Sequence, residues 1–152
     1  MIRLGSLVGL PAALDGRMAG RVEQAVLTPD GRALGGLVIR RGMGTARWAP
    51  SASILVLGNV SVILSRPPVR LPQEAGFLLS GVKDTGGLDL GRVTDAYIHP
   101  GSFRTEALEI SLGLWEEMTC GRMLARHFAV QPAVDGAAQV IIPCGCSLEK
   151  LH

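Results

Sequence analysis

The apolar residues of this chain fall in short segments separated by glycine and proline turns. In residues 107–112, Ala-Leu-Glu-Ile-Ser-Leu, apolar and polar side chains alternate with a period of two. This alternation predicts a strand whose core-facing side chains are Leu108, Ile110 and Leu112. No segment of twelve or more residues has a convincing helical period. We therefore predict an all-β fold with at most short helical turns.

The segment 20–42 is repeated 71 residues later as 91–113. Without a gap, the two segments match at Gly20/Gly91, Arg21/Arg92, Val22/Val93, Ala25/Ala96, Pro29/Pro100, Leu37/Leu108, Ile39/Ile110 and Gly42/Gly113. A repeat of this kind indicates two copies of one structural unit. We expect two small β-barrels related by a pseudo-twofold, residues 1–66 and 74–143, joined by a proline-rich linker at 67–73 and followed by a tail at 144–152.

The repeat transfers strand register from one copy to the other. Leu37 and Ile39 should face the core like their counterparts, whereas Val38 and Arg40 should face outward. In the second copy Glu109 and Ser111 occupy these outward positions.

Alternation fails at the same place in both copies. Two polar residues, Glu23-Gln24 in the first copy and Thr94-Asp95 in the second, precede a short apolar run. An extra residue that bends a strand is the simplest explanation, so we predict a β-bulge at each position.

Turn residues mark the ends of the other elements. We expect turns at Asp15-Gly16 and Pro29-Asp30-Gly31, and a helical turn entered through Pro50. Residues 54–57 and 60–64 should form a hairpin about Gly58-Asn59 with a type II′ turn. In the second copy we expect a turn at 135–136 and a strand at 139–142.

Composition indicates a protein without a membrane span. The longest apolar run, residues 54–64, is interrupted by polar residues and is too short to cross about 30 Å of hydrocarbon. The N-terminal stretch resembles a signal peptide, but its match to the second copy favours a structural strand. An odd number of cysteines, three, favours the reducing cytoplasm.

Charge is divided unevenly between the copies. Residues 1–70 hold nine arginines and three carboxylates, a net charge of +6, whereas residues 71–152 hold six basic and ten acidic residues, a net charge of −4. The basic set is Arg17, Arg21, Arg32, Arg40, Arg41, Arg47, Arg66 and Arg70. It has three readings: packing against the acidic copy through Glu106, Glu109, Glu116 and Glu117, within one molecule or across a dimer; binding of a protein; or binding of nucleic acid. Aromatic residues do not interleave with the arginines, which disfavours stacking on single strands.

Other candidate sites carry weaker signals. Cys144 and Cys146, with Cys120, His127 and His152 elsewhere, lack the paired spacing of a zinc site. We read Asp84, Asp89 and Asp95 as solvated turn acids, and His99 with Ser102 lacks a third partner for nucleophilic catalysis. Trp48 and Trp115 are expected to plug a barrel or line an interface. We therefore predict no catalytic residue, no cofactor and no metal, with Cys144 and Cys146 as weak metal candidates.

A Gly-Arg-Val strand, a Pro or Asp-Gly turn, an apolar strand that closes at glycine, a Pro-led turn and a hairpin together resemble the PRC-barrel family. This family includes barrels of the photosynthetic reaction centre H subunit and of a ribosome-maturation factor. The resemblance covers residues 2–66 and 74–143 and implies docking barrels without catalytic residues. The chain lacks the membrane helix of the first relative and the separate N-terminal domain of the second, so small stand-alone members, including sporulation-associated ones, resemble it more closely.

These observations predict a non-enzymatic cytoplasmic adaptor that binds another protein, with a homodimer as a further arrangement. The alternative is binding of RNA or a ribosomal precursor through the basic first barrel. The expected binding residues are Arg21, Val38, Arg40, Arg41, Arg47 and Trp48.

Overall fold

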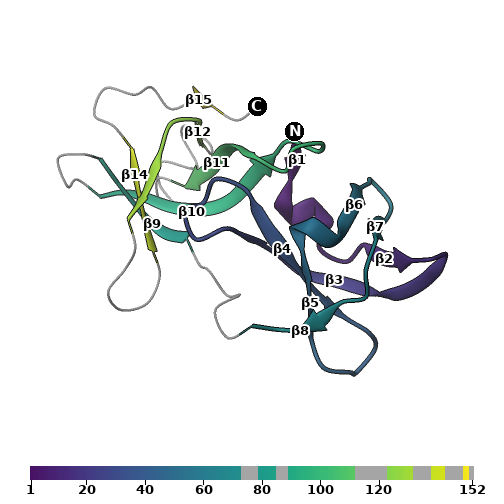
Figure 1. The fold of residues 1–152 in the computed structure, drawn as a ribbon. Helices are drawn as coiled ribbons and strands as arrows, with labels where there is room; N and C mark the ends of the chain where they lie inside the picture. The colour runs from purple at the N-terminus through teal and green to yellow at the C-terminus, as the bar shows by residue number, and fades with distance from the viewer. Residues whose placement is uncertain (73–78, 85–88, 112–122, 132–137, 143–148, 151–152) are drawn as a thin grey trace.

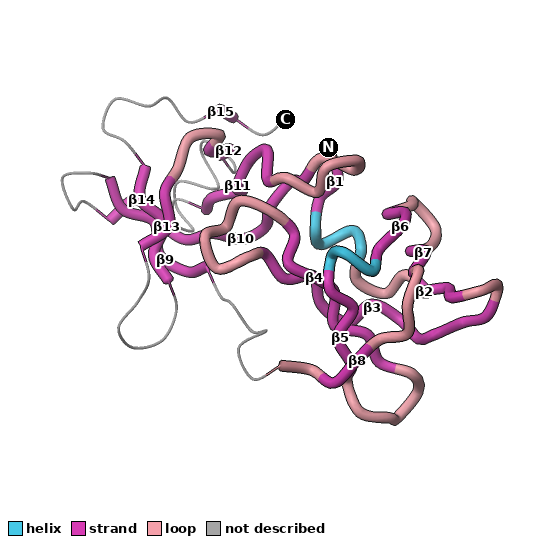
Figure 2. The backbone as a smooth tube through the Cα atoms, in the orientation of Figure 1, coloured by secondary structure: helices cyan, strands magenta, loops and turns pink. Residues whose placement is uncertain are grey.

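The computed structural model describes residues 1–72, 79–84, 89–111, 123–131, 138–142 and 149–150. Their regular structure is β-strand except for two short 3-10 turns, η1 (Leu4–Leu7) and η2 (Ser51–Ser53), drawn in cyan in Figure 2. The predictions of a mostly β fold and of a helical turn after Pro50 are confirmed.

The strands form two sheets, which lie side by side in Figure 1. The first has the order β6-β7-β2-β3-β4-β5-β8 and the second the order β13-β14-β9-β10-β11-β12-β15. The first sheet contains β2 (Pro11–Leu14), β3 (Arg17–Leu27), β4 (Leu34–Arg40), β5 (Arg47–Pro50), β6 (Ile54–Leu57), β7 (Val62–Leu64) and β8 (Val69–Arg70). The second contains β9 (Leu79–Asp84), β10 (Asp89–Ile98), β11 (Thr105–Ser111), β12 (Met123–Ala125), β13 (Ala129–Gln131), β14 (Ala138–Ile142) and β15 (Glu149–Lys150).

The two sheets share one topology. Strand for strand, β9 to β15 follow the order of β2 to β8, and each sheet contains a parallel pair, β2 with β7 and β9 with β14. The strand β1 (Ile2–Arg3) breaks this symmetry, because it comes from the first half of the chain and pairs with β10 of the second sheet.

Equivalent turns of the two halves meet each other. Ala33 forms a bridge with Arg104, which stands 71 residues later and is its counterpart in the repeat. The flanking hydrogen bonds, each 2.8 Å, run from the Leu34 N–H to the Phe103 carbonyl and from the Thr105 N–H to the Arg32 carbonyl. Leu34 and Thr105 are equivalent positions of the repeat, and so are Arg32 and Phe103. Each bond is therefore the counterpart of the other, which is the pattern of a local twofold axis.

Both predicted bulges are present. The register of β3 against β4 shifts between Val22 and Gln24, and that of β10 against β11 shifts between Val93 and Asp95. The extra residue in each strand leaves the ladder and increases its local bend, so the interrupted alternation has a structural cause.

Buried side chains of both sheets form one core. Leu37, Ile39, Leu108 and Ile110 are buried as predicted, and all four belong to one cluster that also contains residues of η1. Because burial of each aliphatic side chain contributes about 1.5–3 kcal/mol, this shared core stabilises both halves together.

Val38 lies on the outer face of β4, but the expectation that it is exposed there as a docking residue is wrong, since only 8% of it is exposed. Trp48 stands directly opposite Val38 in the β4–β5 ladder. The Trp48 indole also lies over Gly36, where an added Cβ would be 2.5 Å from Cζ2. The absence of a side chain at Gly36 lets the indole lie against the outer face of β4 beside Val38.

Glu109 and Ser111, on the outer face of β11, are also buried, at 1% and 3% exposed. Glu109 Oε2 accepts hydrogen bonds from the Arg3 guanidinium at 3.3 Å and from the Thr94 hydroxyl at 3.1 Å. The second outer face is thus covered by the N-terminal segment of the other half, which no local pattern predicts.

Three local predictions need smaller corrections. The N-terminal stretch is a strand at β1, turns into η1, whose i and i+3 side chains Leu4 and Leu7 both enter the core, and is a strand again at β2. The β6–β7 loop has four residues, 58–61, closed by a 3.0 Å bond from the Gly58 N–H to the Ser61 carbonyl, because β7 begins at Val62. The predicted linker contains β8, which pairs with β5.

The remaining turns and strands behave as expected where they are described. Asp15 and Gly16 have positive φ values of 52° and 76° and form the two-residue turn between β2 and β3. The strand β14 covers the predicted segment 139–142, whereas Leu112 and the predicted turn at 135–136 lie outside the described residues.

Candidate binding pocket

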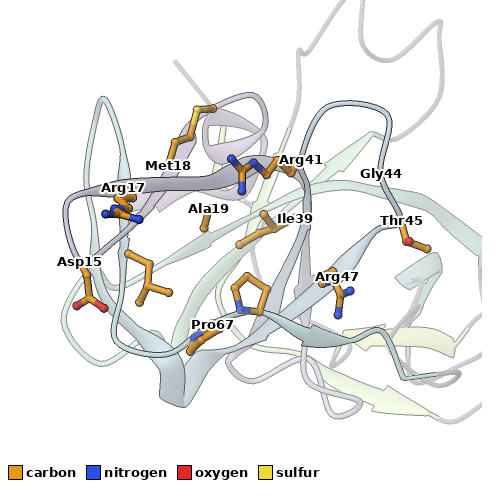
Figure 3. Close-up of a pocket in the computed structure, with 12 residues that line it drawn as sticks. Asp15, Arg17, Met18, Ala19, Ile39, Arg41, Gly44, Thr45, Arg47 and Pro67 are labelled. Atoms are coloured by element: carbon orange, nitrogen blue, oxygen red, sulfur yellow. The ribbon is translucent and has the colours of Figure 1, made fainter.

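A basic pocket of about 890 Å³ opens at one end of the first sheet. Three segments surround it: the β2–β3 turn, the β4–β5 loop and the prolines before β8. Its lining residues are Leu14, Asp15, Arg17, Met18, Ala19, Ile39, Arg41, Gly44, Thr45, Arg47, Pro67 and Pro68. Figure 3 shows Arg17, Arg41 and Arg47 on different sides of the pocket, with Ala19 and Ile39 between them.

Local backbone chemistry positions these arginines. The tight Asp15-Gly16 turn places Arg17 at the first position of β3. The β4–β5 loop is closed by a 3.0 Å hydrogen bond from the Gly44 N–H to the Arg41 carbonyl. Arg40 Nη1 donates a further 2.8 Å hydrogen bond to the Gly44 carbonyl. Both the N–H and the carbonyl of Gly44 are therefore bonded, which fixes the loop that carries Arg41.

The pocket carries excess positive charge. Within the described part of the chain, no carboxylate oxygen lies within 4.0 Å of Arg17, Arg41 or Arg47. Arg47 also stands directly opposite Arg70 in the β5–β8 pair. Like charges placed opposite each other destabilise a sheet, and a bound anion would relieve this repulsion. Arginine is suited to such an anion because its planar fork binds carboxylate or phosphate with two hydrogen bonds.

The predicted binding residues separate into two groups. Arg41 and Arg47 line the pocket. Arg21 and Arg40 lie beside it, along a second hollow of about 480 Å³ that also contains Arg41. Both already have partners, because Arg40 forms a 2.9 Å ion pair with Glu23 and Arg21 donates a 3.1 Å hydrogen bond to the Gly9 carbonyl.

The other two predicted residues are not part of the pocket lining. Val38 is buried, and Trp48 is half-buried against Gly36 on the outer face of β4. Of the two tryptophans expected to plug a barrel or line an interface, Trp48 takes this covering position, whereas Trp115 lies outside the described residues.

Among the described residues of one chain, no arginine of the basic set forms an ion pair with the acidic half. Glu109 is bound by Arg3, which was not in the set, and Arg3 Nε also contacts Asp95 at 2.8 Å. Arg32 does reach the second half, but its guanidinium lies 5.9 Å from the centre of the Phe128 ring and donates to the Phe128 carbonyl. Glu116 and Glu117 lie outside the described residues.

Asp95 is not a solvated turn acid. It lies in the β10 bulge, accepts hydrogen bonds from the Gly5 N–H at 3.1 and 3.2 Å, and pairs with Arg3. The side chains of Asp84 and Asp89 are not described. The halves are thus joined by an ion pair between a carboxylate at the β10 bulge and an arginine near the N-terminus.

His99 stabilises a turn. Its Nδ1 accepts hydrogen bonds from the Gly101 N–H at 3.0 Å and the Ser102 N–H at 3.1 Å. The same turn holds Phe103 at a φ of 61°, which a non-glycine residue rarely adopts. This arrangement gives His99 a structural role in place of the nucleophilic pair considered from sequence.

The candidate metal ligands Cys120, Cys144, Cys146 and His152 lie outside the described residues. Among the residues that the structure places, no three His, Cys, Asp or Glu side chains are grouped so that they could hold a metal ion. None of the helical segments in that part of the chain has the length and apolar character needed to cross a membrane.

Sequence reasoning missed the part that Arg17 and the two prolines play in the pocket. The Asp15-Gly16 turn signal indicated that Arg17 lies at a hairpin tip, but not that this tip faces residues 41–47 and 67–68.

Comparison with known proteins gives no family. No protein-family model matches the chain, and no curated protein sequence matches it.

Proposed function

We propose that this protein is a non-enzymatic adaptor that binds an acidic segment of another protein in the basic pocket. The observation that carries this proposal is the set of three arginines, Arg17, Arg41 and Arg47, that line one pocket without a carboxylate partner among the described residues. The cytoplasm is the compartment we propose for this activity.

The floor of the pocket favours a peptide over RNA. Leu14, Ala19, Ile39, Pro67 and Pro68 give it an apolar surface, and no aromatic side chain is among the lining residues that the structure describes. Single-stranded nucleic acids are usually held by bases stacked on aromatic rings. A peptide with carboxylates beside aliphatic side chains matches both the arginines and the apolar floor. RNA or a ribosomal precursor remains the alternative ligand.

We further propose that the two sheets are tandem barrels of the PRC type. The shared strand order and the exchange of hydrogen bonds between equivalent turns support this proposal. Small docking barrels suit an adaptor, because function in such proteins lies in surface sites and not in the fold itself.

A direct binding experiment tests the adaptor proposal. The probe is a fluorescein-labelled peptide of alternating Glu and Leu, measured by fluorescence anisotropy against the same peptide with Gln in place of Glu. The double variant Arg17→Gln/Arg47→Gln should weaken binding at least about 10-fold, since loss of even one charge-assisted hydrogen bond costs about 1.5–3 kcal/mol. Arg92→Gln removes an exposed arginine of the second sheet and should leave affinity unchanged.

Equal binding of the Glu and Gln peptides would refute the proposal. A labelled single-stranded RNA in parallel tests the alternative: RNA binding that is tighter than peptide binding and falls steeply with salt would assign the pocket to nucleic acid.

A further inference from the structure

The hollow of about 480 Å³ beside the basic pocket continues its positive surface. The linings of the two share Met18 and Arg41, so the hollow and the pocket adjoin each other at β3 and the end of β4. Figure 3 shows these two side chains at the same rim of the pocket. Charged residues of the hollow are the arginines Arg21, Arg40 and Arg41 and one carboxylate, Glu23, a net charge of +2.

Arg40 already binds a carboxylate in this hollow. Its Nε donates a 2.9 Å hydrogen bond to Glu23 Oε2, and its Nη2 donates a 3.3 Å hydrogen bond to Glu23 Oε1. One edge of the guanidinium thus engages both carboxylate oxygens, which is the two-bond geometry that suits arginine to carboxylates. Arg40 Nη1 is used separately, in the bond to the Gly44 carbonyl. Another carboxylate can therefore take the place of Glu23 while the loop stays fixed.

The bulge of β3 supplies this carboxylate. Glu23 stands between Val22 and Gln24, where the register against β4 shifts, and is the extra residue of the bulge. A bulge commonly re-aims a side chain next to a functional site. Here it gives the hollow an acidic side chain beside Arg40.

The repeat shows that the fold does not require this ion pair. The second half retains the bulge, but Thr94 stands in place of Glu23 and Ser111 in place of Arg40. Ser111 is 3% exposed, and the Thr94 hydroxyl donates to Glu109. The ion pair is thus an addition of the first half, which is also the half with the basic pocket.

The ion pair is weak enough to be exchanged. Its side chains are 43% and 46% exposed, and water and salt screen such pairs. Arg21 stands directly opposite Arg40 in the β3–β4 ladder, so like charges repel there and favour an incoming anion. A ligand anchored in the basic pocket presents its next carboxylate at a high effective concentration. Anchoring in the pocket therefore favours exchange at Arg40.

We propose that the acidic segment extends from the basic pocket into this hollow, where one of its carboxylates replaces Glu23 on Arg40. Glu23 is then an internal competitor that holds Arg40 when no ligand is bound and limits the affinity of the site. This inference rests on the proposed function of the basic pocket and adds a second position at which the ligand carries a carboxylate.

Fluorescence anisotropy with the labelled Glu/Leu peptide and its Gln counterpart, in about 150 mM salt, tests the proposal. Glu23→Gln should bind the Glu peptide about 2- to 5-fold more tightly, since about 5-fold is the upper value of an exposed ion pair. Glu106→Gln is the matched control, because it makes the same change in charge on β11 of the second sheet. It should leave affinity unchanged, since salt at this concentration screens exposed charges beyond about 8 Å.

Arg40 separates competition from a general effect of charge. Arg40→Gln should weaken binding of the Glu peptide about 3-fold or more, since a charge-assisted hydrogen bond is lost. In the Arg40→Gln background, Glu23→Gln should give no gain, because there is no guanidinium left to release. Circular dichroism establishes that each variant is folded. If Glu23→Gln fails to fold, Glu23→Thr replaces it, because the second half folds with Thr94 at the equivalent position.

The results distinguish this inference from the function on which it rests. A wild type that binds the Glu and Gln peptides equally would overturn both. A wild type that prefers the Glu peptide, with no gain from Glu23→Gln, would keep the pocket and overturn only the second position. A gain that persists in the Arg40→Gln background, or that Glu106→Gln reproduces, would also overturn it, because the effect would then not pass through Arg40.

Discussion

Replacement of Arg3 by methionine should destabilise the protein far more than replacement of Arg40, although the two arginines look alike at the surface. Their side chains are 44% and 43% exposed, and their shortest contacts to a carboxylate are 2.8 and 2.9 Å. The difference lies in the partners. Arg3 binds Asp95 and Glu109, whose side chains are 10% and 1% exposed, whereas Arg40 binds Glu23, which is 46% exposed.

The expected magnitudes follow from this difference. Loss of one partner from a fully buried ion pair costs about 3–5 kcal/mol, because a charge is left without compensation. The exposure of Arg3 lowers this value, since water screens part of the interaction, and we expect about 2–4 kcal/mol for Arg3→Met. Arg40→Met should cost about 0–1 kcal/mol, the usual range for an exposed pair. Methionine retains much of the aliphatic stem, so lost packing contributes little to either value.

Urea unfolding monitored by circular dichroism measures both changes, provided that the m-values stay constant. Glu109→Gln extends the comparison, because the neutral amide removes the buried charge while it can still accept the Thr94 hydrogen bond. In the Glu109→Gln background, Arg3→Met should cost less than it does in the wild type. Equal losses for Arg3→Met and Arg40→Met would refute the reasoning, since they would show that carboxylate burial does not set the strength of these pairs.

Three further changes test local features. Gly36→Ala places a Cβ 2.5 Å from the Trp48 ring and should lower stability by about 1–3 kcal/mol, as measured by thermal unfolding. The hydrogen bond from the Thr28 hydroxyl lowers the pKa of Asp30, so this carboxylate stabilises the fold above its unfolded-state pKa and loses that effect as the pH falls through its lower folded-state pKa. Thr28→Val should therefore raise the pKa of Asp30 in an NMR titration and reduce the acid dependence of stability. His99→Ala removes the acceptor of two turn amides and should cost about 1 kcal/mol, whereas His99→Asn should recover part of the loss.

The features that sequence predicted well depend on neighbouring residues or on the repeat. The bulges at Glu23 and Thr94 could be predicted because the alternation of apolar and polar residues is interrupted at the same place in both copies. The buried positions of Leu37 and Ile39 followed from the clearer pattern of the second copy. Local patterns are informative here because strand geometry directs successive side chains to opposite faces of a sheet.

The features that sequence did not predict depend on contacts between distant segments. Glu109 looked like an outward residue because its partner Arg3 lies 106 positions away. Val38 looked like a docking residue because alternation gives no sign that Trp48 covers its face. The basic pocket combines three separate segments, so the list of arginines in the first half did not show which of them would meet.

The charge asymmetry of the chain is better explained by two different tasks than by attraction between the basic set and the acidic half. At equivalent positions of the repeat the first half has Gln24 and Val38 where the second has Asp95 and Glu109, and it is these two acids that bind Arg3. The second half therefore uses its extra carboxylates internally to fix the N-terminal segment. The pocket arginines of the first half have no such internal use among the described residues, which leaves their charge available to a ligand. If they served to join the halves, neutralising Arg17 and Arg47 would lower stability as Arg3→Met does; the adaptor proposal requires instead that binding is lost while stability is retained.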